Sequence, residues 1–411
     1  MRAQRLPFED PAATGARLRE LVPAGVSVSG TVSEIVASVR TRGEQALMEY
    51  VERFDHVDGP LRVGADELEA ALAGLDPAVR AGLEVAIANV RAVAEAGIAQ
   101  DRDVDLPQGQ RVTLREVPVR RAAIYVPGGR NPYPSTVVMG VVTARASRVD
   151  EVHVCAPGGH PVMLAAAALC GADAVWRMGG AHAVAAFAYG TDTVPRVDVI
   201  AGPGSLYVQE AKRQVSGDVG IDGFAGPSDV LVLAAADADP ELVALDLSAQ
   251  AEHGAGTVVA LVTDDEALLE TVVARLEREP ETGAEAAAVL VPTLADGLAV
   301  AEAFAPEHLQ LMGEAAEALA PQVCSAGAVF VGRESGTAFG DYVAGSNHTL
   351  PTGGAARFAS GLSPRHFRRR MSVVRIGEAA PALARAGAPI AEAEGFHRHA
   401  VSMRVRENPG G

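Results

Sequence analysis

A glutamate and a histidine adjoin each other in the segment FAPEHLQLMG, at Glu307 and His308. Side by side, a carboxylate and an imidazole can act as successive proton acceptors, which suits an oxidation that must also activate a water molecule. Glu-His pairs also arise by chance, so this hypothesis depends on the chemistry of the other polar segments.

A polar stripe interrupts the apolar segment LDLSAQAEHGAG, residues 245–256. Residues three or four positions apart share a helix face, so Asp246, Gln250 and His253 would line one side. The opposite face is expected to be apolar and comprises Leu242, Val243, Leu245 and Ala249. A stripe of this kind is either solvated surface or one wall of a polar site.

Two further segments concentrate polar side chains. The loop GDYVAGSNHTLPTGG, residues 340–354, carries Asp341 and His348 without apolar periodicity. A long polar loop in an apolar domain is more often functional than not. Near the end of the chain, AEAEGFHRHA carries two glutamates and two histidines: Glu392, Glu394, His397 and His399.

These residues suggest a metal site. Zinc accepts imidazole nitrogen and carboxylate oxygen in tetrahedral geometry. His253, Asp341 and a C-terminal histidine would supply three ligands, and the amide oxygen of Gln250 is an unusual but available fourth. Because the set contains no sulfur ligand, ligand type alone leaves harder metals open.

Glycine-rich turns precede two of the expected helices. YVPGG at 125–129 puts a tyrosine at the end of a strand, and AGPGS at 201–205 repeats the pattern ahead of LYVQEAKRQV. Backbone N–H groups at such helix starts suit phosphate. Neither segment matches the dinucleotide fingerprint GxGxxG or the phosphate loop GxxxxGK[ST], so an ordinary turn and a nucleotide loop both stay open.

The elements that must position these residues follow from hydrophobic patterning. Residues 30–100 show helical spacing, with Thr31 or Ser33 as the first cap and a break at Asp76-Pro77. From residue 119, short apolar runs that end in glycine alternate with helix-like stretches, and a second series starts at GPSDVLVLAA. The alternation predicts two tandem α/β units with parallel sheets, which bind ligands beyond the carboxyl ends of strands. The last forty or so residues are expected to form a charged helical tail.

Composition narrows the function classes. The 411-residue chain carries a formal net charge of −17, which disfavours nucleic acid and anionic membranes as partners, and the basic run RHFRRR at 365–370 is too short to reverse this. Its three cysteines form no CxxC pair and suit a reducing compartment. No signal-peptide core or transmembrane run is visible, so we expect a cytoplasmic protein.

Taken together, the segments resemble the histidinol dehydrogenase family over nearly the whole chain, up to residue 404. YVPGG, EAKRQV, GPSDVLV, SAQAEH, PEHLQ and GDYVAGSNHTLPT occur in the family's order and at its typical spacings. The resemblance implies a four-electron oxidation of L-histidinol, through histidinal, to L-histidine with two NAD⁺. These are the last two steps of histidine biosynthesis.

The resemblance also implies a domain plan of two incomplete Rossmann-like αβα units. Residues 1–118 would form a helical region that packs with the second unit, and 119–227 the first unit, on the nucleotide side. Residues 228–363 would form the second unit, with the zinc and catalytic residues. The tail, 364–411, would be swapped to the partner subunit of an intertwined homodimer with shared active sites.

Site roles are implied residue by residue. The implied zinc ligands are Gln250, His253, Asp341 and, from the partner's tail, His399. Glu394 stands five residues before His399, as in the family pattern, whereas a two-residue slip would select Glu392 and His397. The zinc would hold the substrate through its imidazole and amine.

The remaining implied roles concern the reaction and the cofactor. His308 would accept the protons of the alcohol step and Glu307 would activate water for the aldehyde step. The implied substrate contacts comprise Ser228, Gln250, His253, His308, Asp341, His348, Glu394 and His399. Tyr125 matches the family's nucleotide-contacting tyrosine.

Two positions of the nucleotide site depart from the family pattern. His182 stands where the family usually has glutamine, and Ser205 where it usually has asparagine, which leaves the affinity or preference for the cofactor open. One alternative is a paralogous NAD- and zinc-dependent dehydrogenase of another alcohol, such as a sulfonated diol. A non-catalytic binding protein is a further alternative, but it predicts loss of Glu307 or His308, and both are present.

Overall fold

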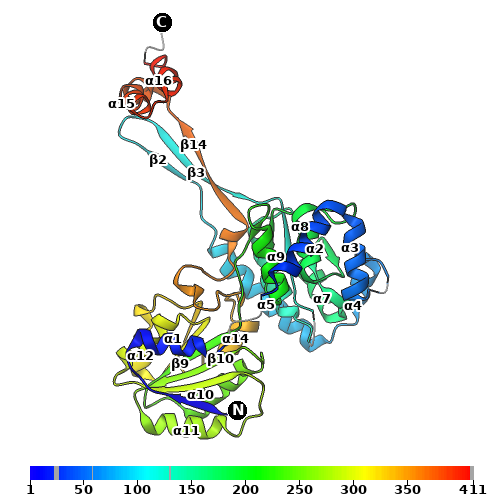
Figure 1. Ribbon diagram of the computed structural model, residues 1–411, viewed down its shortest axis with the longest axis vertical. Coiled ribbons are helices and arrows are strands. Elements are labelled where there is room, and N and C mark those ends of the chain that lie inside the picture. Colours follow the sequence, from blue (N-terminus) through cyan, green and yellow to red (C-terminus); the bar gives the residue numbers. More distant parts are fainter. Residues whose placement is uncertain (23–26, 58, 129–130, 408–411) are drawn as a thin grey trace. The chain divides into compact units, whose positions relative to one another are not determined.

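Two parallel sheets carry most of the chain in this computed structural model, which describes residues 1–22, 27–57, 59–128 and 131–407 (Figure 1). The chain divides into a larger unit, residues 1–97 with 119–367, and a smaller unit, residues 98–118 with 368–411. Each unit is described by itself below. Among the described residues, no helix is long and apolar enough to cross a bilayer.

The first sheet of the larger unit has five parallel strands in the order β6-β5-β4-β7-β8. These are β4 (Arg121–Tyr125), β5 (Glu151–Cys155), β6 (Ala174–Trp176), β7 (Val199–Ala201) and β8 (Gly220–Ile221). The helices between them are α6 (Pro134–Ala146), α7 (Pro161–Cys170), α8 (Gly180–Tyr189) and α9 (Leu206–Val215). The strand order reverses between β4 and β7, so their carboxyl ends form the kind of crevice in which such sheets bind ligands.

The second sheet has six parallel strands in the order β1-β11-β10-β9-β12-β13. These are β1 (Ala3–Leu6), β9 (Asp229–Ala234), β10 (Val258–Thr263), β11 (Glu285–Leu290), β12 (His308–Met312) and β13 (Ala328–Val331). Its helices are α1 (Pro11–Glu20), α10 (Pro240–Ala251), α11 (Glu266–Leu276), α12 (Leu294–Phe304), α13 (Glu314–Glu317) and α14 (Thr337–Tyr342). The predicted α/β class with two tandem parallel units is therefore confirmed.

The helices of the N-terminal region divide between the two sheets. They are α2 (Ser29–Arg42), α3 (Glu44–Tyr50), the π-helical turn η1 (Val51–Asp55), α4 (Ala65–Ala73) and α5 (Pro77–Ala96). Only β1 and α1 join the second sheet, where α1 packs beside α12 (Figure 1). The expectation that the whole region packs with the second unit is wrong for α2 to α5, because their apolar faces pack in or against the two cores of the first sheet.

Of the two helix starts predicted from local sequence signals, one is confirmed and the other is wrong. Asp76 accepts hydrogen bonds from the N–H groups of Ala78 and Val79, so the predicted break before α5 is confirmed. The predicted caps Thr31 and Ser33 are wrong, since α2 begins at Ser29 without a side-chain cap.

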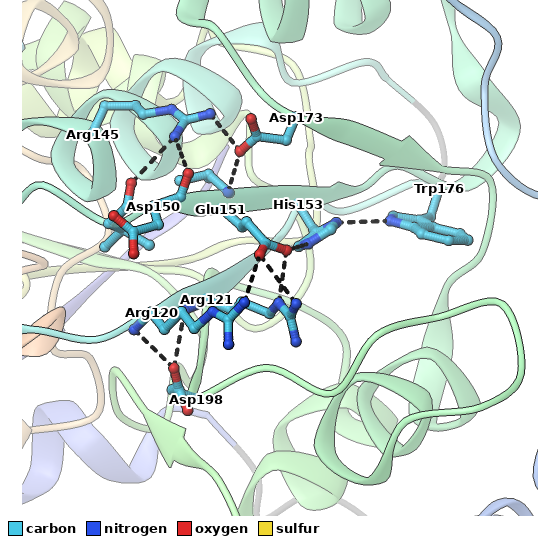
Figure 2. A network of polar contacts seen from close by, with 11 residues as sticks. Arg120, Arg121, Arg145, Asp150, Glu151, His153, Asp173, Trp176 and Asp198 are labelled. Carbon is cyan, nitrogen blue, oxygen red and sulfur yellow. Dashed lines mark hydrogen bonds and ion pairs between the residues drawn. The ribbon is translucent and has the colours of Figure 1, made fainter.

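Charged pairs fix the amino edge of the first sheet (Figure 2). Arg121 donates to Glu151 across β4 and β5 at 2.7 and 3.1 Å. The carboxylate of Asp198 accepts from the backbone N–H groups of Arg120 and Arg121, each at 2.9 Å. These bonds satisfy the polar groups at the starts of the strands. The carboxyl edge of the sheet is therefore the one available to ligands.

The smaller unit is an antiparallel sheet with two helices. Its strands are β2 (Arg102–Asp105), β3 (Arg111–Pro118) and β14 (Arg368–Arg375), and its helices are α15 (Ala380–Ala393) and α16 (His397–Arg404). The expected helical tail is confirmed at α15 and α16, but residues 368–375 form a strand instead. They pair with β3 over its full length, from Arg368 opposite Pro118 to Arg375 opposite Arg111. The short helices η2 to η6 span Pro157–Gly159, Ala320–Gln322, Ala355–Arg357, Pro364–His366 and Gly377–Ala379.

Candidate active site

The polar stripe on α10 faces the protein interior at one residue. Gln250 is buried on the same face as Val243 and Leu247, whereas Leu245 is half exposed. The predicted division into a polar and an apolar face is therefore wrong. Because α10 ends at Ala251, His253 lies beyond the helix, and Asp246 accepts a hydrogen bond from Gln310 at 2.6 Å.

The Glu307–His308 pair lies at the start of β12, next to β9. Both residues are buried, with 5% of Glu307 and 2% of His308 exposed. The ring Nδ1 of His308 lies 3.3 Å from the backbone oxygen of Asp229, which can only accept a hydrogen bond, so Nδ1 carries the proton. Nε2 is therefore unprotonated and has a free lone pair. It has no hydrogen-bond partner among the described residues.

His348 repeats this arrangement. Its Nδ1 lies 2.9 Å from the backbone oxygen of Asp341, and its Nε2 lies 3.1 Å from the hydroxyl of Thr136. The carboxylate of Asp341 lies 3.8 Å from Nε2 of His308. The structure thus brings together three residues that the sequence places in two separate segments.

Burial controls the charges of this cluster. It lowers the pKa values of His308 and His348 to about 4, assisted in both cases by the nearby His253. Burial also lowers the pKa of His253, and it raises that of Asp341 to about 6. The imidazoles are therefore neutral near pH 7, as metal ligands and proton acceptors must be.

Glu307 is held in a different electrostatic setting. Burial, and then the neighbouring Asp229 carboxylate, raise the pKa of Glu307 well above its usual range. Hydrogen bonds from the Asp229 N–H and from Ser228 act in the opposite direction. A carboxylate with a raised pKa is a stronger base once it is ionised, which suits proton abstraction from water.

The donors on the larger unit fit zinc in type but not in number. Gln250, His253 and Asp341 offer an amide oxygen, an imidazole and a carboxylate, and the buried Nε2 of Gln250 lacks a partner in the described ranges. No three His, Cys, Asp or Glu residues among those described lie close enough together to hold a metal ion. A four-coordinate site would therefore need a ligand from elsewhere.

The C-terminal candidates lie on the smaller unit. His397 and His399 both belong to α16, and Glu394 caps the end of α15. All three side chains are exposed, and the ring of His399 packs edge-on against Phe396 at 5.2 Å. The smaller unit alone does not select between His397 and His399.

The nucleotide candidates line a cavity of about 1070 Å³ at the carboxyl edge of the first sheet. Tyr125, His182 and Ser205 all contribute to it. The Tyr125 hydroxyl accepts a hydrogen bond from the Gly180 N–H at 2.9 Å, and burial raises the pKa of this phenol. The predicted turn after Tyr125 continues to Gly129, which lies outside the described residues.

A glycine and a buried ion pair shape the second turn. Gly202 has a φ of +122°, and a Cβ atom there would lie 2.1 Å from the Tyr125 carbonyl oxygen. Lys212 donates to the Gly202 carbonyl at 3.0 Å and pairs with Asp222, which accepts from the Gly202 N–H at 2.7 Å. Tyr125 of the first glycine-rich segment and Gly202 of the second thus lie next to each other.

Sequence patterns missed several residues of these sites. Asp55 lines the cavity, lies 2.7 Å from His182 and accepts from the Gly179 N–H at 3.2 Å. Asp229 accepts a hydrogen bond from the Glu307 N–H, and Arg19 donates to the carbonyl oxygen of Ala305, two residues earlier in the chain. The one available signal was a charged residue at the start of an apolar strand, in GPSDVLV.

Comparisons with known proteins cover nearly the whole chain. A family model described as histidinol dehydrogenase matches residues 23–407. The histidinol dehydrogenase of Nocardia farcinica (strain IFM 10152) is 45% identical over 421 residues, with 95% of each chain covered. That of Parasynechococcus marenigrum (strain WH8102) is 43% identical over 397 residues, covering 92% of this chain and 91% of the relative. The crystal structure of histidinol dehydrogenase from Elizabethkingia anophelis matches with a TM-score of 0.92 at 30% identity, covering 98% of both chains.

Proposed function

This chain belongs to the histidinol dehydrogenase family, and from that premise we propose that it oxidises L-histidinol to L-histidine through L-histidinal. The observation that carries the proposal is the buried Glu307–His308 pair beside Asp341 and His348. Two bases at one place suit a substrate carbon that is oxidised twice, first as an alcohol and then as an aldehyde hydrate.

Both implied cofactors have residues that fit them. Gln250, His253 and Asp341, with His399 of the partner subunit, would hold zinc, which when bound orients the substrate through its imidazole and amine. Tyr125 and the cavity around it would hold NAD⁺, which would supply the hydride acceptor. The departures at His182 and Ser205 keep hydrogen-bonding groups at the nucleotide site.

His308 performs the proton transfer of the alcohol step. Its Nδ1–H faces the Asp229 carbonyl, so the lone pair on Nε2 takes the hydroxyl proton of the substrate. Removal of this proton lets the carbon give up a hydride, for which a bound NAD⁺ would be the acceptor, and the alcohol becomes the aldehyde. One substrate thus gives one NADH and one proton in this step.

Glu307 performs the proton transfer of the aldehyde step. Its carboxylate takes a proton from water, whose oxygen adds to the aldehyde carbon and forms the hydrate in its singly deprotonated form. Loss of a second hydride from that carbon gives the carboxylic acid and a second NADH. The hydrogen bond from Ser228 orients the carboxylate for this task.

The substrate contacts and the assembly complete the proposal. Ser228 and His348 contact the substrate on one subunit, and Glu394 of the partner subunit contacts it from across a homodimer. The shared sites explain why the larger unit holds an incomplete ligand set. A biosynthetic enzyme that depends on free NAD⁺ and a small soluble substrate is expected to be cytoplasmic.

The test is the amount of NADH formed per L-histidinol consumed by the purified protein, with and without a zinc chelator. We expect two NADH per substrate, loss of activity on chelation, and recovery on adding zinc. A zinc-loaded protein that leaves histidinol unchanged would contradict the proposal. Other alcohols, including sulfonated diols, would then be tested as substrates with the same NADH assay.

A further inference from the structure

We infer that Asp229, which Arg19 holds in place, is the positioning residue for Glu307. Asp229 therefore supports the aldehyde step more than the alcohol step. The inference rests on the proposed function, because it assigns a separate effect to one of the two steps. Neither residue is a catalytic residue, since each acts through the Glu307–His308 segment.

All three polar groups of Asp229 face the two bases. Its carboxylate accepts from the Glu307 N–H at 2.7 Å, and its own N–H donates to the Glu307 carboxylate at 3.1 Å. Its carbonyl oxygen lies 3.3 Å from Nδ1 of His308. The reciprocal pair fixes the backbone and the carboxylate of Glu307, while the carbonyl fixes the tautomer of His308.

Arg19, from α1, closes this arrangement from the other side. Its guanidinium pairs with the Asp229 carboxylate at 2.5 Å and donates to the carbonyl oxygens of Phe304 and Ala305 at 2.5 and 2.9 Å. It also lies 3.6 Å above the centre of the Phe304 ring. One side chain therefore holds both the carboxylate and the backbone that leads into Glu307.

The held backbone is in a conformation that needs support. Ala305 has φ and ψ of 50° and 67°, in the left-handed region. That region is sterically disfavoured for a residue with a Cβ. Ala305 is buried and stands two residues before Glu307. Without Arg19, we expect this segment to relax toward an ordinary backbone conformation, which would displace the Glu307 carboxylate.

The side-chain contacts predict an effect on one step rather than on both. A substitution of the Asp229 side chain removes its bond to the Glu307 N–H but retains the backbone carbonyl that faces His308. The geometry of the aldehyde step is lost while the proton acceptor of the alcohol step is kept. A merely structural ion pair would slow both steps alike.

The test compares single-turnover rates for histidinol and for added histidinal in zinc-loaded variants. In Asp229→Asn, one amide oxygen cannot serve both Arg19 and the Glu307 N–H. We expect the ratio of the aldehyde rate to the alcohol rate to fall about tenfold or more. NADH per histidinol should fall from two toward one as histidinal is released. Arg19→Lys keeps the charge but not the three contacts, so its ratio of aldehyde rate to alcohol rate should lie between those of wild type and Asp229→Asn. This variant replaces Asp229→Asn in the test if Asp229→Asn fails to fold.

Two comparisons separate positioning from general destabilisation. Glu151→Gln breaks an ion pair in the first sheet and should leave the ratio of the two rates unchanged. In a Glu307→Gln background, adding Asp229→Asn should cause no further fall in the aldehyde rate. Equal slowing of both steps in the Asp229 and Arg19 variants would overturn the inference. Failure of the wild-type protein to oxidise histidinol would instead overturn the proposed function.

Discussion

His308 and His348 are prepared for their tasks in the same way. In each residue, Nδ1 faces a backbone carbonyl oxygen, at 3.3 Å for His308 and 2.9 Å for His348, and Nε2 is left as the lone pair. Burial lowers both pKa values to about 4. A tautomer fixed by the backbone needs no neighbouring carboxylate, so each ring can present the same nitrogen to a substrate at any pH at which it is neutral.

The identity of the tail ligand is a prediction at this scale. We expect His399→Ala and His253→Ala each to weaken zinc binding by more than about a hundredfold, because each would remove one of the four proposed ligands. His397→Ala is the matched control on the same helix and should retain zinc. The measurement is zinc per subunit after dialysis against a weak chelator. Loss of zinc in His397→Ala alone would select the two-residue slip, and retention in both would show that the tail holds no ligand.

At the scale of elements, the strand and helix order followed from local patterns. Aliphatic runs predicted the strands at 121–125 and 229–234, and Asp76-Pro77 predicted the start of α5. The pairing of β14 with β3 joins segments some 250 residues apart, and no local period contains that information. The burial of Gln250 could not be predicted from the sequence either, because helical periodicity assigns a glutamine to the solvent side.

The edge on which the site lies was another property that patterns did not supply. The expected ligand position, beyond the carboxyl ends of strands, applies to Tyr125 and Gly202 in the first sheet. In the second sheet, Asp229 and His308 are the first residues of their strands, so the candidate site lies at the amino edge. The end of α10 leads directly into β10 and thus reaches the same edge.

The charged amino edge of the first sheet leads to a prediction about pH (Figure 2). Hydrogen bonds from Arg121 lower the pKa of Glu151 below its ordinary value of 4.5. The ionised pair therefore stabilises the fold above about pH 4.5, and this contribution is lost as the pH falls through the lower folded-state pKa.

Glu151→Gln tests this contribution. We expect it to reduce the free energy of unfolding at pH 7 by about 1 kcal/mol, since the pair is partly exposed. The difference from wild type should shrink as the pH falls below 4.5, as measured by urea unfolding at a series of pH values. A difference that stays constant down to pH 3.5 would assign the effect to packing rather than to ionisation.

At the scale of the whole molecule, the smaller unit has little core of its own. Its buried cluster consists of Ala388, Ala391 and Ala400, with Met403 packed against it. Large apolar side chains on or directly beside the two helices are at least half exposed, namely Ile390, Phe396, Val401 and Val405. Exposed apolar groups of this kind are typical of an interaction surface, which supports the proposal that this unit contacts a partner subunit.

A complementation experiment tests whether the tail acts on the partner. His253→Ala damages the larger unit and His399→Ala the smaller unit, so each homodimer is expected to be inactive. If the tails are exchanged, a mixed dimer contains one site with both defects and one intact site. Random mixing on co-expression would then restore about a quarter of the wild-type sites, and zinc content and NADH formation should recover together.

The matched control is co-expression of His253→Ala with Asp341→Ala. Both substitutions lie on the larger unit, so every site of a mixed dimer keeps one defect and activity should stay absent. If each tail served its own chain, the His253→Ala and His399→Ala pair would be as inactive as this control. Recovery in the first pair alone therefore requires that residues from two chains meet in one active site.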